Sequence, residues 1–293
     1  MEIRNILTFL KVAGTQNFSK AAEQLGYSQS AVTVQIQQLE RELQTQLFER
    51  IGKRVYLTEQ GEAFVYHANE IMKVVNQAAD FSGEKSAVKG KLRIGGVESV
   101  CTALLPELIF QLYQRYPEIE VVIKSGTTTE LVEMAKRNDL DFVFTLDRKI
   151  CSPEWICAFE KKEEIIFVTD ARENTEERAI QEIVKRPFIL TEMGAAYQYE
   201  LEGLLAEREL LIEPILEIGN TETIIKLLKK RMGVSFLPEF TVHKELETGK
   251  LARLYTDLPG VTMHSQLLYH KNKWLTPQMK SFIKLVRETV SSI

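Results

Sequence analysis

The N-terminal part of the chain contains three short runs of apolar residues at helical spacing, separated by glycines. The first run predicts a helix over residues 3–13, which Gly14 ends. The second predicts a short helix with Ser19 as its N-cap and Gly26 at its end. The third predicts a helix that begins after Ser28, with one apolar face and a small, polar opposite face. Two short helices joined by a tight glycine turn are typical of a helix-turn-helix, whose second helix enters the major groove of DNA.

Two further patterns follow this helical part. Residues 50–58 are rich in basic residues and predict a small β-wing, whose cations would contact phosphates. Beyond Thr58, apolar residues recur at alternating spacings of four and three, which is a heptad seam suited to a two-helix coiled coil. Packing of this seam inside its own subunit is the alternative. The seam residues, which we predict to mediate dimerisation, are Phe64, Ala68, Ile71, Val75 and Ala78.

From residue 91 onward, predicted strands and helices alternate, which favours an α/β domain with mostly parallel strands. Predicted strands cover residues 92–95, 119–124, 142–145, 165–169, 188–191, 215–218 and 234–237. Predicted helices lie near residues 104–115, 130–137, 199–209, 222–230 and 277–290. We therefore expect a DNA-binding domain over 1–58, a linker helix and hinge over 59–90, and a two-lobed domain over 91–293. Lobe 1 would hold about 91–162 and 267–293, including the last helix, and lobe 2 about 163–266.

Composition narrows this picture without changing it. The 293 residues are 44% hydrophobic and 27% charged, as in ordinary soluble proteins of two domains. The net charge of −4 gives no overall signal for nucleic acid, so any DNA contact must be local. The sequence has no signal peptide pattern, no membrane-spanning run and no Cys-x-x-Cys pair, so we expect a cytoplasmic protein without a membrane partner.

Motifs for catalysis and for cofactor binding are missing from the sequence. It contains no Gly-x-Ser-x-Gly, P-loop, Gly-x-Gly-x-x-Gly or His-Glu-x-x-His pattern. The four histidines are scattered, without the spacing of metal ligands. We therefore expect neither an enzyme nor a protein with a metal or other resident cofactor.

Residues 17–50 read NFSKAAEQLGYSQSAVTVQIQQLERELQTQLFER, and Thr58, Glu59, Gln60 and Gly61 follow the wing. This stretch resembles the LysR-type transcriptional regulators. Looser similarity continues through LRIG at 92–95, LLP at 104–106, LDFVF at 140–144 and GVSFLP at 233–238. The resemblance implies a winged helix-turn-helix, a long dimerising linker helix, and a C-terminal domain folded like periplasmic solute-binding proteins.

The resemblance also implies a function. Members of this family assemble as dimers or tetramers and bind imperfect palindromes in double-stranded DNA. They bend the DNA and alter recruitment of RNA polymerase when a small-molecule effector occupies the cleft between the lobes. The alternatives are a cytosolic small-molecule-binding protein and a thiol-based redox sensor that uses Cys101.

The third predicted helix carries the candidate residues for DNA reading. Its N-terminus offers short donors and acceptors for base edges, and Gln29 is the first candidate. Where the family usually has basic or long polar residues, this chain has Val34 and Gln37, which suggests apolar contact with thymine methyl groups. A merely solvated helix face is the alternative. The predicted set is Ser28, Gln29, Ser30, Thr33, Val34 and Gln37, with Arg50, Lys53 and Arg54 for phosphates.

In the family, effectors bind at helix N-termini that face the cleft, where backbone N–H groups and hydroxyls hold polar, often carboxylate, groups. At one such position this chain has Glu98, whose carboxylate would repel an anionic ligand unless paired, so cationic, zwitterionic and neutral effectors stay open. Ordinary N-caps are the alternative for the hydroxyl residues. The predicted effector-binding set is Val97, Glu98, Ser99, Thr127, Thr128, Ala195, Tyr197, Asn220 and Thr221.

Overall fold

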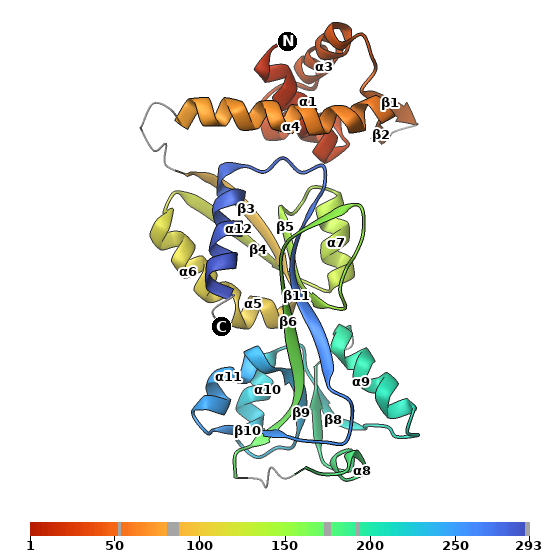
Figure 1. Cartoon of the computed structure of the whole chain (residues 1–293), viewed down its shortest axis with the longest axis vertical. Coiled ribbons are helices and arrows are strands. Elements are labelled where there is room, and N and C mark those ends of the chain that lie inside the picture. Colours follow the sequence, from red (N-terminus) through yellow and green to blue (C-terminus); the bar gives the residue numbers. More distant parts are fainter. Residues whose placement is uncertain (52–53, 81–87, 173–176, 192–193, 291–293) are drawn as a thin grey trace.

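The computed structural model describes residues 1–51, 54–80, 88–172, 177–191 and 194–290. Three parts follow one another along its long axis, a helical head and two α/β lobes (Figure 1). Lys53 and the centre of the predicted hinge, residues 81–87, lie outside the described residues. Within the described part, no helix combines the length and the apolar character needed to cross a membrane.

The head is the predicted winged helix-turn-helix. It contains α1 (Ile3–Thr15), α2 (Phe18–Leu25), α3 (Gln29–Leu43), β1 (Phe48–Ile51), β2 (Arg54–Leu57) and α4 (Glu59–Asp80). Ser28 caps α3 as predicted, because its side chain accepts from the backbone N–H of Ala31 at 3.2 Å. The predicted cap of α2 is wrong. Asn17 is the N-cap, because its extended backbone brings Oδ1 to 3.0 Å from the backbone nitrogen of Lys20, and Ser19 lies in the first turn.

The start of α4 explains the residues Thr58 to Gly61. The Thr58 hydroxyl donates to the carbonyl of Gln46 at 2.7 Å and accepts from the backbone N–H of Gly61 at 3.0 Å. A Cβ on Gly61 would lie 2.1 Å from the carbonyl oxygen of Leu47, which no side chain tolerates. Glycine therefore allows α4 to start directly against the wing.

The predicted heptad seam packs inside its own subunit in this chain. Ala68 is fully buried, and Phe64, Ile71 and Val75 are partly buried against the core of the head. The side chain of Ala78 lies outside the described residues. The large exposed apolar side chains on the described part of α4 are Tyr66 and Val74, which are 69% and 61% exposed. The dimerisation role of the seam stays a prediction, and the alternative of internal packing accounts for the four described seam residues.

The C-terminal part is built on a seven-stranded sheet of order β10-β6-β11-β5-β3-β4, with β9 also paired to β6. A second sheet contains β7 and β8. The strands are β3 (Gly90–Gly96), β4 (Ile119–Ser125), β5 (Phe142–Asp147), β6 (Trp155–Asp170), β7 (Phe188–Leu190), β8 (Pro214–Glu217), β9 (Ser235–Pro238), β10 (Leu251–Leu254) and β11 (Val261–His270).

The expectation of mostly parallel strands is wrong. β3 is parallel to β4 and β5, and β7 to β8. However, β6 pairs antiparallel with β9, β10 and β11, and β11 pairs antiparallel with β5. Only the end of β6 was predicted, because a charged run over residues 160–164 precedes it, and β11 was not predicted, because its apolar and polar residues do not alternate regularly.

Helices cover both lobes. They are α5 (Glu98–Ala103), α6 (Leu105–Arg115), α7 (Thr128–Lys136), α8 (Ile180–Ile183), α9 (Ala196–Ala206), α10 (Thr221–Leu228), α11 (Glu239–Glu247) and α12 (Pro277–Thr289). Lobe 1 holds β3–β5, α5–α7 and α12, and lobe 2 holds β7–β10 and α8–α11 (Figure 1). The paired strands β6 and β11 run through both lobes. As predicted, α12 returns to lobe 1, where it packs on α6 and β3.

Charged side chains gather where the head lies on lobe 1. The ion pair of Lys20 in α2 with Asp139, at 2.5 Å, crosses between the two parts. On the lobe 1 side, below α1, the Asp141 carboxylate accepts from Arg93 Nη2 at 2.8 Å and from Lys273 Nζ at 2.7 Å. Burial lowers the pKa of Lys273 to about 8. We call these contacts the head junction, and a cavity of only about 40 Å³ lies there, between α1 and lobe 1.

Candidate functional site

The predicted DNA-reading residues share one exposed face of α3. Val32, Ile36 and Leu39 fix the helix in the core of the head. The opposite face is open to solvent, and α3 lies at the end of the molecule away from the lobes (Figure 1). The exposed members of the predicted set are Ser28, Gln29, Ser30, Val34 and Gln37, and Thr33 is half-buried beside them.

Hydrogen bonds order the N-terminal turn of this face. The amide oxygen of Gln29 accepts from the hydroxyl of Ser19 at 2.9 Å. The hydroxyls of Ser28 and Ser30 lie 2.9 Å apart, and that of Thr33 donates to the carbonyl of Gln29 at 3.0 Å. Ser19, predicted only as a cap, is therefore a site residue that sequence reasoning assigned to another role.

The wing is attached directly to α3. Glu40 Oε1 accepts from the backbone N–H groups of Leu47 at 2.8 Å and Phe48 at 3.2 Å, at the start of β1. In the hairpin, Arg50 pairs with Val55 and Arg54 with Ile51. The side chains of Arg50 and Arg54, like the whole of Lys53, lie outside the described residues, so their phosphate contacts stay a prediction.

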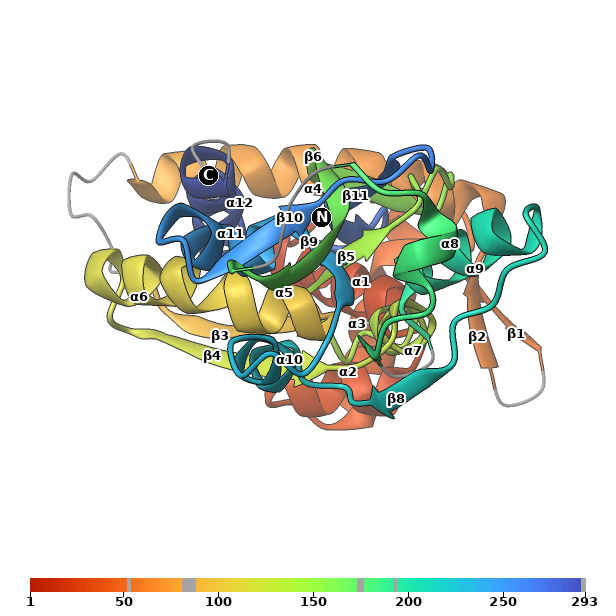
Figure 2. The ribbon, with the colours of Figure 1, turned by 90° about the horizontal axis from the view of Figure 1, so that it is seen from below.

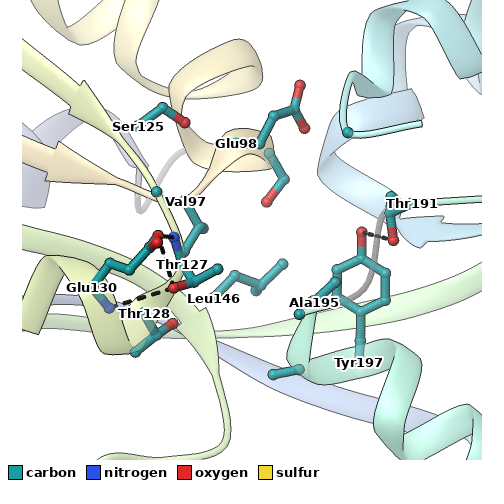
Figure 3. Close-up of a pocket in the computed structure, with 15 residues that line it drawn as sticks. Val97, Glu98, Ser125, Thr127, Thr128, Glu130, Leu146, Thr191, Ala195 and Tyr197 are labelled. Atoms are coloured by element: carbon teal, nitrogen blue, oxygen red, sulfur yellow. Dashed lines mark hydrogen bonds between the residues drawn. The ribbon is translucent and has the colours of Figure 1, made fainter. Parts of the chain in front are cut away.

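A cavity of about 310 Å³ lies between the two lobes (Figure 3). Among the predicted effector-binding residues, Val97, Glu98, Ser99, Thr127, Thr128, Ala195 and Tyr197 line it. Asn220 and Thr221 do not line it, but they lie at the start of α10 next to Gly219, which does. The lining residues that sequence reasoning missed are Ser125, Gly126, Glu130, Leu146, Thr191, Gly194, Ala196 and Gly219.

The ends of parallel strands supply several of the missed residues. Ser125 ends β4, and Thr191 directly follows β7. Ligands in open α/β sheets bind beyond the carboxyl ends of such strands, so the strand predictions contained a usable signal for both residues. Leu146, next to last in the parallel strand β5, carried the same signal, whereas Glu130 carried none, because it lies in the first turn of a helix.

Thr127 is both a helix cap and a lining residue. Its hydroxyl accepts from the backbone N–H of Glu130, and Glu130 Oε2 accepts from the backbone N–H of Thr127 at 2.9 Å and from its hydroxyl at 3.0 Å. The bonds from Thr127 hold the pKa of the Glu130 carboxyl below its ordinary value. Glu130 is therefore ionised at neutral pH, at the edge of the pocket.

Glu98 links the two lobes. It begins α5 in lobe 1, and its Oε1 accepts from the hydroxyl of Thr102 at 2.9 Å. The same oxygen accepts from the backbone N–H of Thr221 at 3.0 Å, across the cleft at the start of α10. The Thr221 hydroxyl donates to the other oxygen, Oε2. The Glu98 carboxylate is therefore paired by hydrogen bonds rather than by a cation.

The lobe 2 side of the pocket is more apolar. Burial raises the pKa of Tyr197 to about 12, and its hydroxyl donates to that of Thr191 at 3.4 Å. A Cβ on Gly194 would lie 3.4 Å from Thr127 Cγ2, which shows how closely this loop approaches lobe 1. A ligand here would contact hydroxyls and carboxylates on lobe 1, and an aromatic ring with small side chains on lobe 2.

The thiol alternative receives no support from the surroundings of Cys101. Burial raises the pKa of its thiol, which disfavours the reactive thiolate, and its Sγ donates to the carbonyl of Gly96 at 3.3 Å. In the described residues, no group of three or more His, Cys, Asp or Glu side chains is placed to hold a metal ion.

Comparisons with known proteins agree with this geometry. Residues 3–62 match the model of the "Bacterial regulatory helix-turn-helix protein, lysR family", and residues 85–291 match the "LysR substrate binding domain". The chain is 32% identical to the uncharacterized HTH-type transcriptional regulator YwqM of Bacillus subtilis, over 99% of each chain.

Solved structures show the same fold. Full-length OxyR from Pseudomonas aeruginosa is similar with a TM-score of 0.57 and 19% identity, over 98% of this chain and 95% of that one. Vibrio fischeri DarR in complex with DNA is similar with a TM-score of 0.55 and 18% identity, over 98% of each chain. LysR regulators bind DNA and form oligomers, and effector binding is typical of them. With a helix-turn-helix head and a two-lobed C-terminal part matched along nearly its whole length, the chain belongs to the LysR family of transcriptional regulators.

Proposed function

We propose that the outer face of α3 reads DNA sequence and that the wing holds the DNA backbone. The single observation that carries this proposal is the exposed polar face whose first residue, Gln29, is oriented by Ser19. A glutamine amide can pair with both hydrogen-bonding groups of adenine in the major groove. Val34, 59% exposed, offers an apolar surface to a thymine methyl group.

The phosphates would be contacted by Arg50, Lys53 and Arg54. These basic residues are close together in the sequence of the wing, and phosphate contacts supply affinity without sequence preference. A dimer would double the number of phosphate contacts. The exposed residues Tyr66 and Val74 of α4 suit a contact with a second subunit at least as well as the seam does, because the seam is used within the head.

The cleft is the proposed effector site. Its lining combines a ring, small side chains and several hydroxyls, which is the composition of a small-molecule pocket. Occupancy of a pocket between two lobes changes their relative position, and through the head junction this change reaches the DNA-binding head. The proposed role is binding in the cytoplasm and not catalysis, since the relatives are regulators.

Gel shifts of the full chain on duplexes from the control region of its own gene test the DNA proposal. We expect Gln29→Ala to lose about tenfold or more of its preference for the specific duplex over a scrambled one, because base contacts carry sequence information. Arg54→Ala should weaken binding to both duplexes alike and reduce the salt dependence, because it removes a phosphate contact.

The matched control is Gln114→Ala, which removes an exposed glutamine from α6 in lobe 1, away from the head. It should bind as the wild type does. If Gln29→Ala keeps its sequence preference, or if the wild type binds no duplex at moderate salt, the proposed reading face is wrong.

A further inference from the structure

The described lining of the interlobe pocket carries negative charge and no cation. Glu98 and Glu130 both line it, and its described lining contains no Lys, Arg or His. Fixed carboxylates repel an anionic ligand and attract a cationic one, most strongly where water is partly excluded. The remaining polar lining consists of hydroxyls, which can accept hydrogen bonds from a protonated nitrogen. These hydroxyls belong to Ser99, Ser125, Thr127, Thr128, Thr191 and Tyr197.

The N-terminus of α10 already holds an anion supplied by the chain. Such a helix end is favourable for a negative group, because its first N–H groups are free and its dipole is positive. Here the N–H of Thr221 donates to Glu98 Oε1 at 3.0 Å, and the N–H of Thr223 donates to Asn220 Oδ1 at 2.8 Å. Glu98 therefore occupies the place at which a ligand carboxylate would bind α10.

The N-terminus of α7, on the other side of the pocket, is closed in the same way. Glu130 and Thr127 satisfy each other's backbone N–H groups in a capping box. The carboxylate of Glu130 remains exposed to the cavity (Figure 3). By contrast, α9 has Ala195 as its N-cap and no side-chain cap. Any anionic group of a ligand would therefore lie toward α9, and a cationic group toward Glu98 and Glu130.

We propose that the pocket binds its ligand through a cationic group, an ammonium or a similar protonated nitrogen, that faces Glu98 and Glu130, and that Glu98 excludes carboxylates from α10. This inference rests on the proposed function of the cleft as an effector site. Glu98 is thus a specificity-determining residue that also holds the two lobes together.

Three probes with the same four-carbon skeleton test the charge preference. Thermal unfolding of the full chain is followed with 1,4-diaminobutane, 1,4-butanediol and succinate at equal ionic strength, up to tens of millimolar. At about ten times its Kd, the diamine should raise Tm by about 2–5 °C, and succinate should not raise it. Glu130→Gln should remove most of the diamine shift. An equal or larger shift with succinate, or no shift with the diamine, overturns the proposal.

Chemical rescue tests the role of Glu98. Glu98→Ala opens the start of α10, so acetate should raise the Tm of this variant by about 2 °C or more and leave the wild type unchanged. Glu222→Ala is the matched control, because it removes a carboxylate from the first turn of α10 outside the pocket lining. Acetate should not stabilise it. Acetate that stabilises the wild type and Glu98→Ala equally contradicts the role.

Glu98→Gln keeps the test decisive if Glu98→Ala does not fold. This variant retains the size of the side chain but loses its charge, so we expect it to bind the diamine at least about tenfold more weakly. Unchanged diamine affinity overturns the proposal.

The gel shift separates the failure of the charge preference from the failure of the proposed function. A chain that binds DNA but prefers succinate refutes the charge preference alone, whereas a chain that binds no duplex refutes the proposed function.

Discussion

Two junctions connect the three parts of this chain, and they are built from different interactions. At the head junction, Asp141 lies between Arg93 and Lys273 beside a cavity of about 40 Å³. Between the lobes, Glu98 is held by Thr221 beside a cavity of about 310 Å³. The first junction holds its buried carboxylate between two cations and has little room for a ligand. The second is held by hydrogen bonds next to a large cavity, so a ligand can alter it.

The two junctions also differ in what it costs to break them. A buried ion pair that loses one partner leaves an uncompensated charge in a low-dielectric region. A hydrogen bond that loses one donor leaves a carboxylate with its remaining donors and access to water in the cavity. The lobe 1 side of the head junction should therefore be a rigid base under the head, and the contact between the lobes an adjustable one.

The largest effect should follow from removing the acid of the head junction. Asp141→Ala leaves Lys273 and Arg93 without their shared carboxylate, and we expect it to lower the free energy of unfolding by about 3–5 kcal/mol. Denaturant unfolding of the full chain, followed by circular dichroism, measures this. Asp139→Ala is the matched control, since its pair with Lys20 is partly exposed and should contribute less than about 1 kcal/mol. If Asp141→Ala and Asp139→Ala lowered the free energy of unfolding equally, the buried contact would contribute no more than the surface contact.

Acid should weaken the head junction to a smaller extent. Burial acts to raise the pKa of Asp141, but the charges and hydrogen bonds of Lys273 and Arg93 outweigh it and lower the pKa below its ordinary 3.8. Because the pKa is lower in the folded state, this stabilisation is complete above the unfolded value and is lost as pH falls through the folded value. Stability should decline below about pH 4, and less steeply in Asp141→Asn. Denaturant curves between about pH 3 and pH 6 test this. If the free energy of unfolding fell equally steeply in the wild type and in Asp141→Asn, the prediction would be wrong.

The smallest effect should come from the contact between the lobes. Thr221→Val removes the hydroxyl that donates to Glu98 while keeping the shape of the side chain, so we expect a loss of about 1–2 kcal/mol. Thr223→Val is the control, because its hydroxyl bonds only Asn220 within the same helix end. Its effect should be less than half as large. A loss at Thr221 as large as that at Asp141 would show that the contact between the lobes is as costly to break as the buried ion cluster below the head.

The head was predictable because its signals are local. Apolar spacing, Ser28 as a cap and a glycine turn specify the helices, and the family resemblance gave their order along the chain. The error at α2 is equally local, since Asn17 and Ser19 are both good caps and only backbone conformation decides between them. Seven of the nine effector-binding residues that the family resemblance implied line the pocket.

Long-range pairings were not predictable from these patterns. Charged residues 160–164 interrupt β6, and the apolar residues of β11 do not alternate regularly. The pairing of these two strands joins residues about a hundred positions apart, which no local pattern indicates. The contact of Glu98 with Thr221 joins residues 123 positions apart, and no sequence spacing indicates it. The apolar spacing of the α4 seam does not distinguish packing within a subunit from packing between subunits, because both use the same spacing.

The paired strands β6 and β11 determine how the lobes can move. The two run side by side from one lobe to the other (Figure 1), and in the view from below both lie near the middle of the molecule's width (Figure 2). Their backbone hydrogen bonds continue from one lobe into the other. A sliding displacement would break this ladder at every residue, whereas bending or twisting would keep it intact. Any opening of the pocket should therefore be a rotation about the paired strands β6 and β11. Such a rotation would displace side chains far from these strands, including those at the mouth of the pocket, more than side chains close to them, while the backbone hydrogen bonds of the pair stay intact.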